Sequence, residues 1–446
     1  MTRKPVGRAA VAAVASLALG AALLAATSLP AAADDSPGGS RERDGQLQRV
    51  AYFVQWGIYA RQYFVKNVAT SGQAAHLTTI NYAFGGIKDD GTCTSLDPWA
   101  DYQRPVSAAE SVDGVADAPG QPLAGNFNQL RKLKHLYPNL RVVLSLGGFT
   151  GSTLFSDVAL TQASRQKFVA SCLDLFVKGD LPTGAGAAAG VFDGIDVDWE
   201  WPVTPAAAGT HARPEDKRDL TLLLAEFRRQ LADLGRQTHR RYLLTQFLPA
   251  DPVKIRAGFE VPAIFHLLDW ATVQGYDLHG TWERTTNHQS SLFSPPGDPS
   301  PEKFSVDLAI RTYLSMDAPA RKLVLGVPFY ERGWTGVPDV NHGLFQTSTA
   351  ADPAAPGTFE NGVDDFKVVA AKTGFQLFRD RRDGVAWLFD GSTFWTFDDP
   401  TALSEKMAYV RARHLGGAMA WSLDGDDAGA SLVKAVDAGL RRGESG

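Results

Sequence analysis

Four acidic residues lie within eight positions in the stretch from Asp193 to Glu200, which reads Asp-Gly-Ile-Asp-Val-Asp-Trp-Glu. The Ile, Val and Trp residues between the acids favour a strand. Alternate side chains of a strand share a face, so Asp196, Asp198 and Glu200 are expected to point the same way. Carboxyl groups about 6–7 Å apart along one face repel one another, so one of them should keep its proton near neutral pH. A protonated carboxyl group is what a general acid requires.

A metal site is the main alternative for this acid cluster, because clustered acids also bind calcium or magnesium. An EF-hand loop has a glycine at its sixth position and a glutamate at its twelfth, and this stretch lacks that spacing. His266 and His279 lack the spacing of metal ligands as well. A solvated acidic face would not alternate with Ile, Val and Trp. The pattern therefore favours catalysis, and neither a metal nor an organic cofactor is expected.

The acid-bearing strand belongs to a regular series of elements. Apolar runs alternate with helix-like segments such as 162–178, 215–234, 301–314 and 401–413, and Pro214 is a helix-start signal before the second of these. Strands alternating with helices predict an α/β fold, a (β/α)8 or TIM barrel with parallel strands. The eight apolar runs are 50–55, 78–84, 141–147, 192–199, 242–248, 270–275, 323–329 and 417–421.

Residues with functional chemistry follow several of these runs. In such barrels the catalytic residues lie at the C-terminal ends of the strands. Glu200 ends the fourth run, Ser-Leu-Gly-Gly at 145–148 ends the third, Gln-Gly-Tyr-Asp at 274–277 ends the sixth, and Trp421 ends the eighth. A glycine pair at a strand end lets the backbone pass close to a ligand. We expect these residues to surround one site.

These segments resemble glycoside hydrolase family 18, the chitinase family. Residues 193–200 match the DxxDxDxE signature of that family at all four acids, and residues 145–148 resemble its SxGG motif. Residues 274–277 resemble its Met-x-Tyr-Asp motif, with Gln274 where Met is usual. Residues 328–332 resemble its Pro-Phe-Tyr-Gly-Arg motif, with Glu at the position of the Gly. The resemblance extends from residue 50 to about 430 and implies the same barrel.

The resemblance also implies roles for individual residues. Glu200 would be the general acid and base, and Asp198 would hold the acetamido N–H of the sugar. Tyr276 would donate a hydrogen bond to the acetamido oxygen. The tryptophans Trp56, Trp282 and Trp395 are either core residues or further sugar-stacking surfaces. The residues implied to bind the sugar are Tyr52, Ser145, Gly147, Gly148, Phe149, Trp201, Gln274, Asp277, Arg332 and Trp421.

The implied mechanism uses the substrate itself. Most glycosidases place two carboxylates around the scissile bond, whereas in family 18 the 2-acetamido oxygen attacks its own anomeric carbon and forms an oxazolinium ion. Water then opens this ion with retention of configuration. The implied function is a secreted chitinase that cleaves β-1,4 bonds in chitin and chito-oligosaccharides, acts as a monomer and needs no cofactor.

Three alternatives remain beside the chitinase. An endo-β-N-acetylglucosaminidase acting on N-glycans would share the motifs, although an aromatic-rich insertion favours a long chitin groove. A lectin-like relative that binds chitin without cleaving it typically lacks the acid found here at Glu200. A calcium-binding protein would lose its stability or activity when a chelator is added.

The segment at 331–398 is too long for a barrel loop and holds eleven aromatic residues. These can form a core of their own, so the segment is predicted to be a small α+β insertion domain between strands seven and eight. The catalytic barrel would then comprise residues 49–330 and 399–440. The family resemblance places an insertion at the same point.

The first 33 residues are predicted to be a signal peptide, with three basic residues, an Ala/Leu-rich run and an Ala-Ala-Ala cleavage site at 31–33. Residues 34–48 are polar, rich in Gly and Ser, and predicted to be a disordered leader. The mature protein would be extracellular, without a membrane segment. In an exported chain Cys93 and Cys172 are expected to pair, and two separate thiols are the alternative. The net charge of −5 and the lack of a basic run exclude a nucleic-acid partner.

Overall fold

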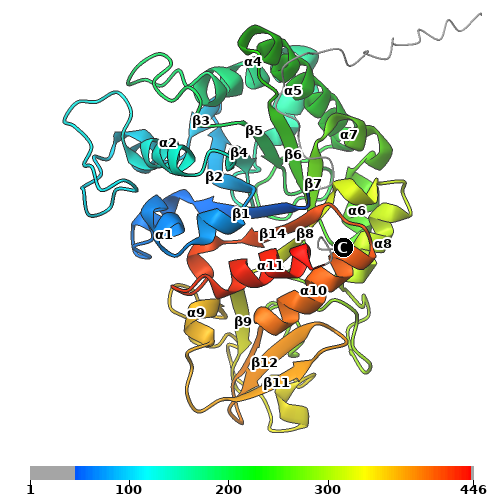
Figure 1. The fold of residues 1–446 in the computed structure, drawn as a ribbon. Helices are drawn as coiled ribbons and strands as arrows, with labels where there is room; N and C mark the ends of the chain where they lie inside the picture. Colours follow the sequence, from blue (N-terminus) through cyan, green and yellow to red (C-terminus); the bar gives the residue numbers. More distant parts are fainter. Residues whose placement is uncertain (1–45, 443–446) are drawn as a thin grey trace, which may run out of the picture. The chain divides into compact units, whose positions relative to one another are not determined.

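Parallel strands close into a ring in the computed structural model of this chain, which describes residues 46–442 (Figure 1). Around the ring the order is β1, β14, β8, β7, β6, β5, β4 and β2, and β2 pairs with β1 to close it. Each strand overlaps one of the eight predicted apolar runs, so the predicted (β/α)8 barrel is confirmed. The strands are β1 (Gln48–Val54), β2 (Thr79–Ile87), β4 (Arg141–Gly147), β5 (Gly194–Asp198), β6 (Leu243–Leu248), β7 (Trp270–Val273), β8 (Leu323–Pro328) and β14 (Gly417–Trp421).

The predicted signal peptide and most of the predicted leader lie outside the described residues. Strand β1 begins at Gln48, which was the last residue assigned to the leader. None of the helices between residues 46 and 442 is both long and apolar enough to cross a membrane.

Helices pack around the outside of the ring (Figure 1). They are α1 (Val65–Thr70), α2 (Gly125–Leu136), α3 (Phe155–Leu160), α4 (Gln162–Cys172), α5 (Asp216–Thr238), α6 (Pro252–Gly258), α7 (Val261–Leu267), α8 (Val306–Leu314), α10 (Pro400–Ala412) and α11 (Ser431–Arg441). Helix α5 buries Leu220, Leu223 and Phe227, the spacing of one helical face. The predicted start of α8 at 301 is five residues too early, because Ser305 caps the helix by accepting the N–H of Leu308.

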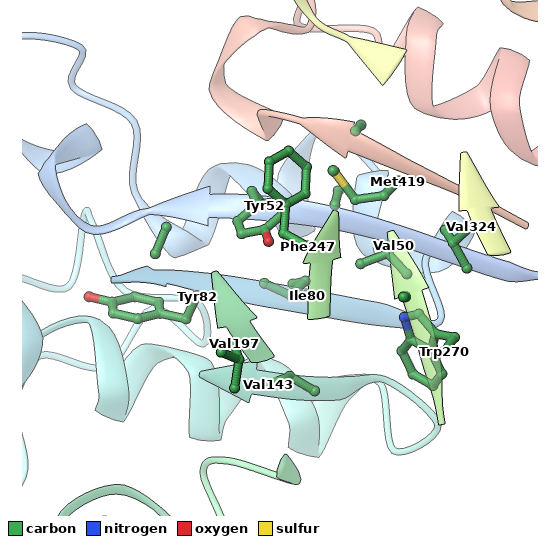
Figure 2. Close-up of a cluster of buried hydrophobic side chains, with 14 of the residues drawn as sticks. Val50, Tyr52, Ile80, Tyr82, Val143, Val197, Phe247, Trp270, Val324 and Met419 are labelled. Carbon is green, nitrogen blue, oxygen red and sulfur yellow. The ribbon is translucent and has the colours of Figure 1, made fainter. Parts of the chain in front are cut away.

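Apolar side chains from the strands fill a continuous core. Figure 2 shows Val50 and Tyr52 of β1, Ile80 of β2, Phe247 of β6 and Met419 of β14 in this cluster. All five are at most 5% exposed. The ends of the strands are therefore held in fixed positions, as a site built from several strands requires.

A second, antiparallel sheet follows β8 in the chain, in the order β10-β9-β13-β12-β11. Trp334, Trp387, Phe389 and Phe394 give it a hydrophobic cluster of its own, whereas Trp395 packs into the main core. Four aromatic residues of this segment thus form a cluster of their own, and the assignment of the segment as a separate insertion domain stays a prediction. The elements are β9 (Tyr330–Trp334), β10 (Val363–Asp365), α9 (Phe366–Val369), β11 (Gln376–Asp380), β12 (Val385–Phe389) and β13 (Phe394–Phe397).

One short strand has no counterpart in the predictions. Strand β3 (Cys93–Ser95) pairs antiparallel with the end of β2. The sulfurs of Cys93 and Cys172 are bonded, with their Cα atoms 4.9 Å apart, so the bridge joins β3 to the end of α4. A three-residue strand carries too little periodicity to be detected from sequence.

Candidate active site

Asp196 lies at the base of the site, in the middle of β5. Its carboxylate accepts hydrogen bonds from Tyr52 Oη at 2.8 Å, Ser145 Oγ at 2.8 Å and Thr245 Oγ1 at 2.6 Å. Burial raises the pKa of Asp196, and these three donors counteract the rise by stabilising the charged form. The donors come from β1, β4 and β6, so the barrel itself fixes this acid.

Asp198 and Glu200 form the upper part of the acid column. Burial and then the charge of Asp277 raise the pKa of Glu200, and it reaches about 8. Burial and then the charge of Glu200 hold the pKa of Asp198 well above its usual range. The two acids therefore retain a proton between them at neutral pH. This is the protonation state that a general acid needs.

Ser152, which was not predicted from the sequence, holds the backbone at Glu200 in place. The N–H of Glu200 donates to Ser152 Oγ at 2.9 Å, and that hydroxyl lies 2.8 Å from the carbonyl oxygen of Gly148. The N–H of Gly148 donates to the carbonyl oxygen of Asp198 at 2.9 Å. At Gly147, with φ +107°, an added Cβ would lie 2.3 Å from that same carbonyl oxygen. Only glycine allows this contact between the ends of β4 and β5.

Above the acids the ends of the strands enclose a cavity of about 1070 Å3. This volume lies at the upper end of the range that ligand pockets have. The predicted residues that line it are Tyr52, Gly147, Phe149, Asp198, Glu200, Trp201, Gln274, Tyr276, Asp277, Arg332 and Trp421. They come from strands far apart in sequence, so the barrel brings most of the predicted site together.

Three predicted site residues lie beneath the cavity and do not line it. Asp196 is 1% exposed, as expected for an acid that acts through Asp198. The assignment of Ser145 to sugar binding is wrong, because this serine is fully buried and donates to Asp196. Gly148 also lies behind the wall, since an added Cβ would meet the ring of Phe84 at 2.6 Å. Both residues support the acids from below.

Aromatic rings form the floor of the cavity. The ring of Trp421 lies 4.9 Å from that of Tyr52 and stacks on that of Phe84 at 5.7 Å, measured between centroids. Trp56, which is 40% exposed, lies 6.5 Å from Trp421. Such a surface suits the apolar face of a sugar ring. Phe84 was missed because nothing in its local sequence sets it apart from a core residue.

Tyr276 stands at the end of β7 beside the acids. Burial and then the charge of Asp198 hold the pKa of its hydroxyl well above the usual range, so it stays a hydrogen-bond donor. Its neighbour Asp277 has φ +54° and accepts Arg332 Nε at 2.9 Å and Nη2 at 2.8 Å. The guanidinium group of Arg332 also lies 5.1 Å from the ring centroid of Trp282. This side of the cavity is therefore a rigid polar wall.

Several lining residues carried no signal in the sequence. Lys254 of α6 faces the cavity, and its charge lowers the pKa of Glu200. Leu96, Glu283, Phe304 and Glu360 also line it. Between residues 46 and 442, no group of three or more His, Cys, Asp or Glu side chains is arranged to hold a metal ion. The arrangement offers a proton donor, a buried carboxylate and a phenolic donor above an aromatic floor.

Known proteins are similar to this chain in sequence and in fold. The family described as glycosyl hydrolases family 18 matches residues 48–426. Chitinase 63 of Streptomyces plicatus is 37% identical over 405 residues, and chitinase C of Streptomyces lividans is 38% identical over 398. These alignments cover 89% and 87% of this chain but only 61% and 59% of the two relatives, so the chain spans about three fifths of their length.

A solved structure gives the same result. The catalytic domain of psychrophilic chitinase B from Arthrobacter TAD20 superposes with a TM-score of 0.85 at 41% identity, covering 90% of this chain and 96% of that domain. Sequence and fold thus agree over nearly the whole described region. The chain belongs to glycosyl hydrolase family 18.

Proposed function

We propose that this protein is a chitinase that hydrolyses β-1,4 bonds between N-acetylglucosamine units with retention, through an oxazolinium intermediate. The observation that carries the proposal is the pair of buried acids Asp198 and Glu200 beside Tyr276, above the Trp421 floor. All three groups converge on one cavity, which suits a reaction in which the substrate supplies the nucleophile. The relatives named as chitinases support the same substrate class.

In this mechanism Glu200 protonates the leaving oxygen while the acetamido oxygen attacks the anomeric carbon. Asp198 accepts the acetamido N–H and stabilises the positive charge that develops on the ring. The hydroxyl group of Tyr276 donates a hydrogen bond to the acetamido oxygen. Glu200 then takes a proton from water, which opens the oxazolinium ion from the same face. Asp196 stabilises Asp198 or shares a proton with it, while Tyr52, Ser145 and Thr245 donate to its carboxylate and hold it in place.

Glu200→Gln tests the assignment of the acid. The amide is nearly isosteric but has no proton to give, so turnover of chitin hexamer should fall by about 10²–10⁴-fold while binding is kept. Glu215→Gln, an exposed carboxylate ahead of α5, is the matched control and should leave both unchanged. Turnover of Glu200→Gln within about twofold of the parent would exclude Glu200 as the acid.

Substrate choice is tested with the same enzyme. Chitin oligomers should be cleaved, and the first reducing ends released should be β anomers by NMR. Release of N-glycans from a high-mannose glycoprotein without cleavage of the oligomers would indicate the endo-β-N-acetylglucosaminidase instead. In partly acetylated chitosan the new reducing ends should be N-acetylated, since glucosamine has no acetamido oxygen to attack with. Frequent glucosamine at those ends would rule out substrate assistance.

We also propose that the protein is exported and acts as a monomer. The basic start, the apolar run and the Ala-Ala-Ala site at 31–33 support export. The N-terminal residue of the protein recovered from the culture medium should be Asp34. Recovery of the unprocessed chain from the cell only would contradict this.

A further inference from the structure

A lysine is buried completely behind the cavity wall. Lys406 of α10 is 0% exposed, and its Nζ lies 2.5 Å from Asp398 Oδ2 and 2.6 Å from Ser290 Oγ. Lysine is seldom buried unless it is paired, because removing an ammonium group from water is costly. The mechanism above makes no use of this ion pair. Ser290 belongs to the long segment between β7 and α8.

The hydrogen bond between Lys406 and Ser290 can have only one direction. An ammonium group has protons but no acceptor, so Ser290 Oγ accepts from Lys406. The proton of the serine hydroxyl is then left to donate. The carbonyl oxygen of Gly275 lies 2.5 Å away, and the carboxylate of Asp398 is the other acceptor beside this hydroxyl. Because each bond polarises the next, the charge of Lys406 strengthens the bond from Ser290 to Gly275.

The chain of hydrogen bonds ends on the peptide that carries Tyr276. The Gly275 carbonyl and the Tyr276 N–H belong to one planar unit, so holding that oxygen fixes the direction in which Tyr276 leaves the backbone. On the opposite side Gly275 packs against β8, where an added Cβ would meet the carbonyl oxygen of Gly326 at 2.0 Å. Ser290 and β8 thus hold this peptide from two sides.

The residue next to Ser290 holds the adjoining wall. Gln289 is fully buried, and its Nε2 donates to the carbonyl oxygen of Tyr330 at 2.6 Å. Its own carbonyl oxygen accepts the N–H of Leu278 at 2.9 Å. The ring of Tyr330 packs edge-on against that of Tyr276, with centroids 5.9 Å apart. Two consecutive residues, Gln289 and Ser290, therefore brace Tyr276 and Tyr330.

We propose that Ser290 and Lys406 are positioning residues for Tyr276, with Lys406 orienting the Ser290 hydroxyl and Ser290 fixing the Gly275–Tyr276 peptide. This inference rests on the proposed function, in which Tyr276 donates to the acetamido oxygen. Asp398 holds the ammonium group in place. The cluster links α10, which follows the second sheet, to the reacting end of β7.

Ser290→Ala tests the proposal with chitin hexamer as substrate. A hydrogen bond that matters most in the transition state lowers kcat more than it changes KM, so kcat should fall about tenfold with KM within about threefold. Ser291→Ala, the buried serine next to it, is the matched control and should keep kcat within about twofold. Thermal denaturation of each variant, measured in parallel, corrects the rates for the folded fraction.

A double-mutant cycle with Tyr276→Phe separates positioning from mere stability. If Ser290 acts through the Tyr276 hydroxyl, Ser290→Ala should cost less than about twofold in kcat when that hydroxyl is already absent. Lys406→Met, which removes the orienting charge, should behave in the same way. Equal losses in both backgrounds, or a Ser290→Ala enzyme as active as the parent, would overturn the proposal. A parent enzyme without activity on chitin oligomers would instead refute the proposed function, so the two failures are distinguishable.

Discussion

Glu200 and Asp198 share a retained proton because both are buried and each opposes the ionisation of the other. The proposed reaction needs Glu200 in its acid form, whose pKa is raised to about 8. The rate constant kcat/KM should therefore fall as the pH rises through about 8. Lys254 favours the charged form of Glu200, so Lys254→Gln should move this alkaline midpoint upward. A pH profile of kcat/KM on chitin tetramer measures both effects.

Lys254→Arg is the control for this prediction, because it keeps the positive charge on α6. Its alkaline midpoint should stay close to that of the parent, whatever the change in rate. A midpoint that moves equally in Lys254→Gln and Lys254→Arg would show that shape, and not charge, connects Lys254 with Glu200.

At the scale of elements, the Cys93–Cys172 bridge joins β3 to α4 across a sequence separation of 79 residues. Closing a loop of this length restricts the unfolded chain by about 4–5 kcal/mol in the chain-entropy treatment. The double variant Cys93→Ser/Cys172→Ser should therefore fold and bind chitin oligomers but melt about 5 °C lower, given the unfolding entropy of a chain of this size. Differential scanning calorimetry measures the change.

Reduction provides the matching control for the disulfide. Dithiothreitol should lower the Tm of the parent protein toward that of the double variant and leave the variant itself unchanged. Two free thiols in the denatured, unreduced protein would show that the bridge does not form.

At the scale of the whole molecule, Glu331 lies where β9 of the second sheet meets α10. Its carboxylate is fully buried, and no side chain among the described residues donates a hydrogen bond to either oxygen. Asp398, Asp399 and Lys406 face it from α10 and the turn before it, and Asp364 lies opposite it on β10. Burial and then the charge of Asp398 hold the pKa of Glu331 well above its usual range. The native protein thus keeps a proton that the unfolded chain releases above about pH 4.3.

A group with a raised native pKa stabilises the fold less and less as the pH rises from its unfolded pKa to its native pKa. Glu331→Gln removes this loss, because the amide does not titrate. The Tm of Glu331→Gln relative to the parent should therefore increase between pH 5 and pH 9, and become several degrees higher at the alkaline end. Glu405→Gln, one position before Lys406, is the control. A Tm difference for Glu331→Gln that is independent of pH would show that Glu331 is ionised in the native protein.

The sequence alone determined the barrel and the acid column. Alternation of apolar runs with helices is a local property, and it identified all eight strands to within a few residues. Because a parallel barrel collects its strand ends on one face, the motif residues Glu200, Tyr276 and Trp421 could be assigned to one site before any contact was known. The spacing of Asp196, Asp198 and Glu200 likewise predicted a shared proton, since strand geometry fixes how close the carboxyl groups lie.

Only the tertiary structure decided which residues hold the acids and Tyr276 in place. Ser145 shares a motif with the glycines at the edge of the cavity, yet its side chain points inward and donates to Asp196. The local sequence does not determine how deeply this side chain is buried. Ser152 and Ser290 each fasten the backbone of a reacting residue, and nothing in their surroundings distinguishes them from other serines. Their bonds join residues 48 and 15 positions apart, and Lys406 reaches Ser290 across 116. Local periodicity reports which face of an element is buried, whereas partners at such separations are chosen by how the elements pack together.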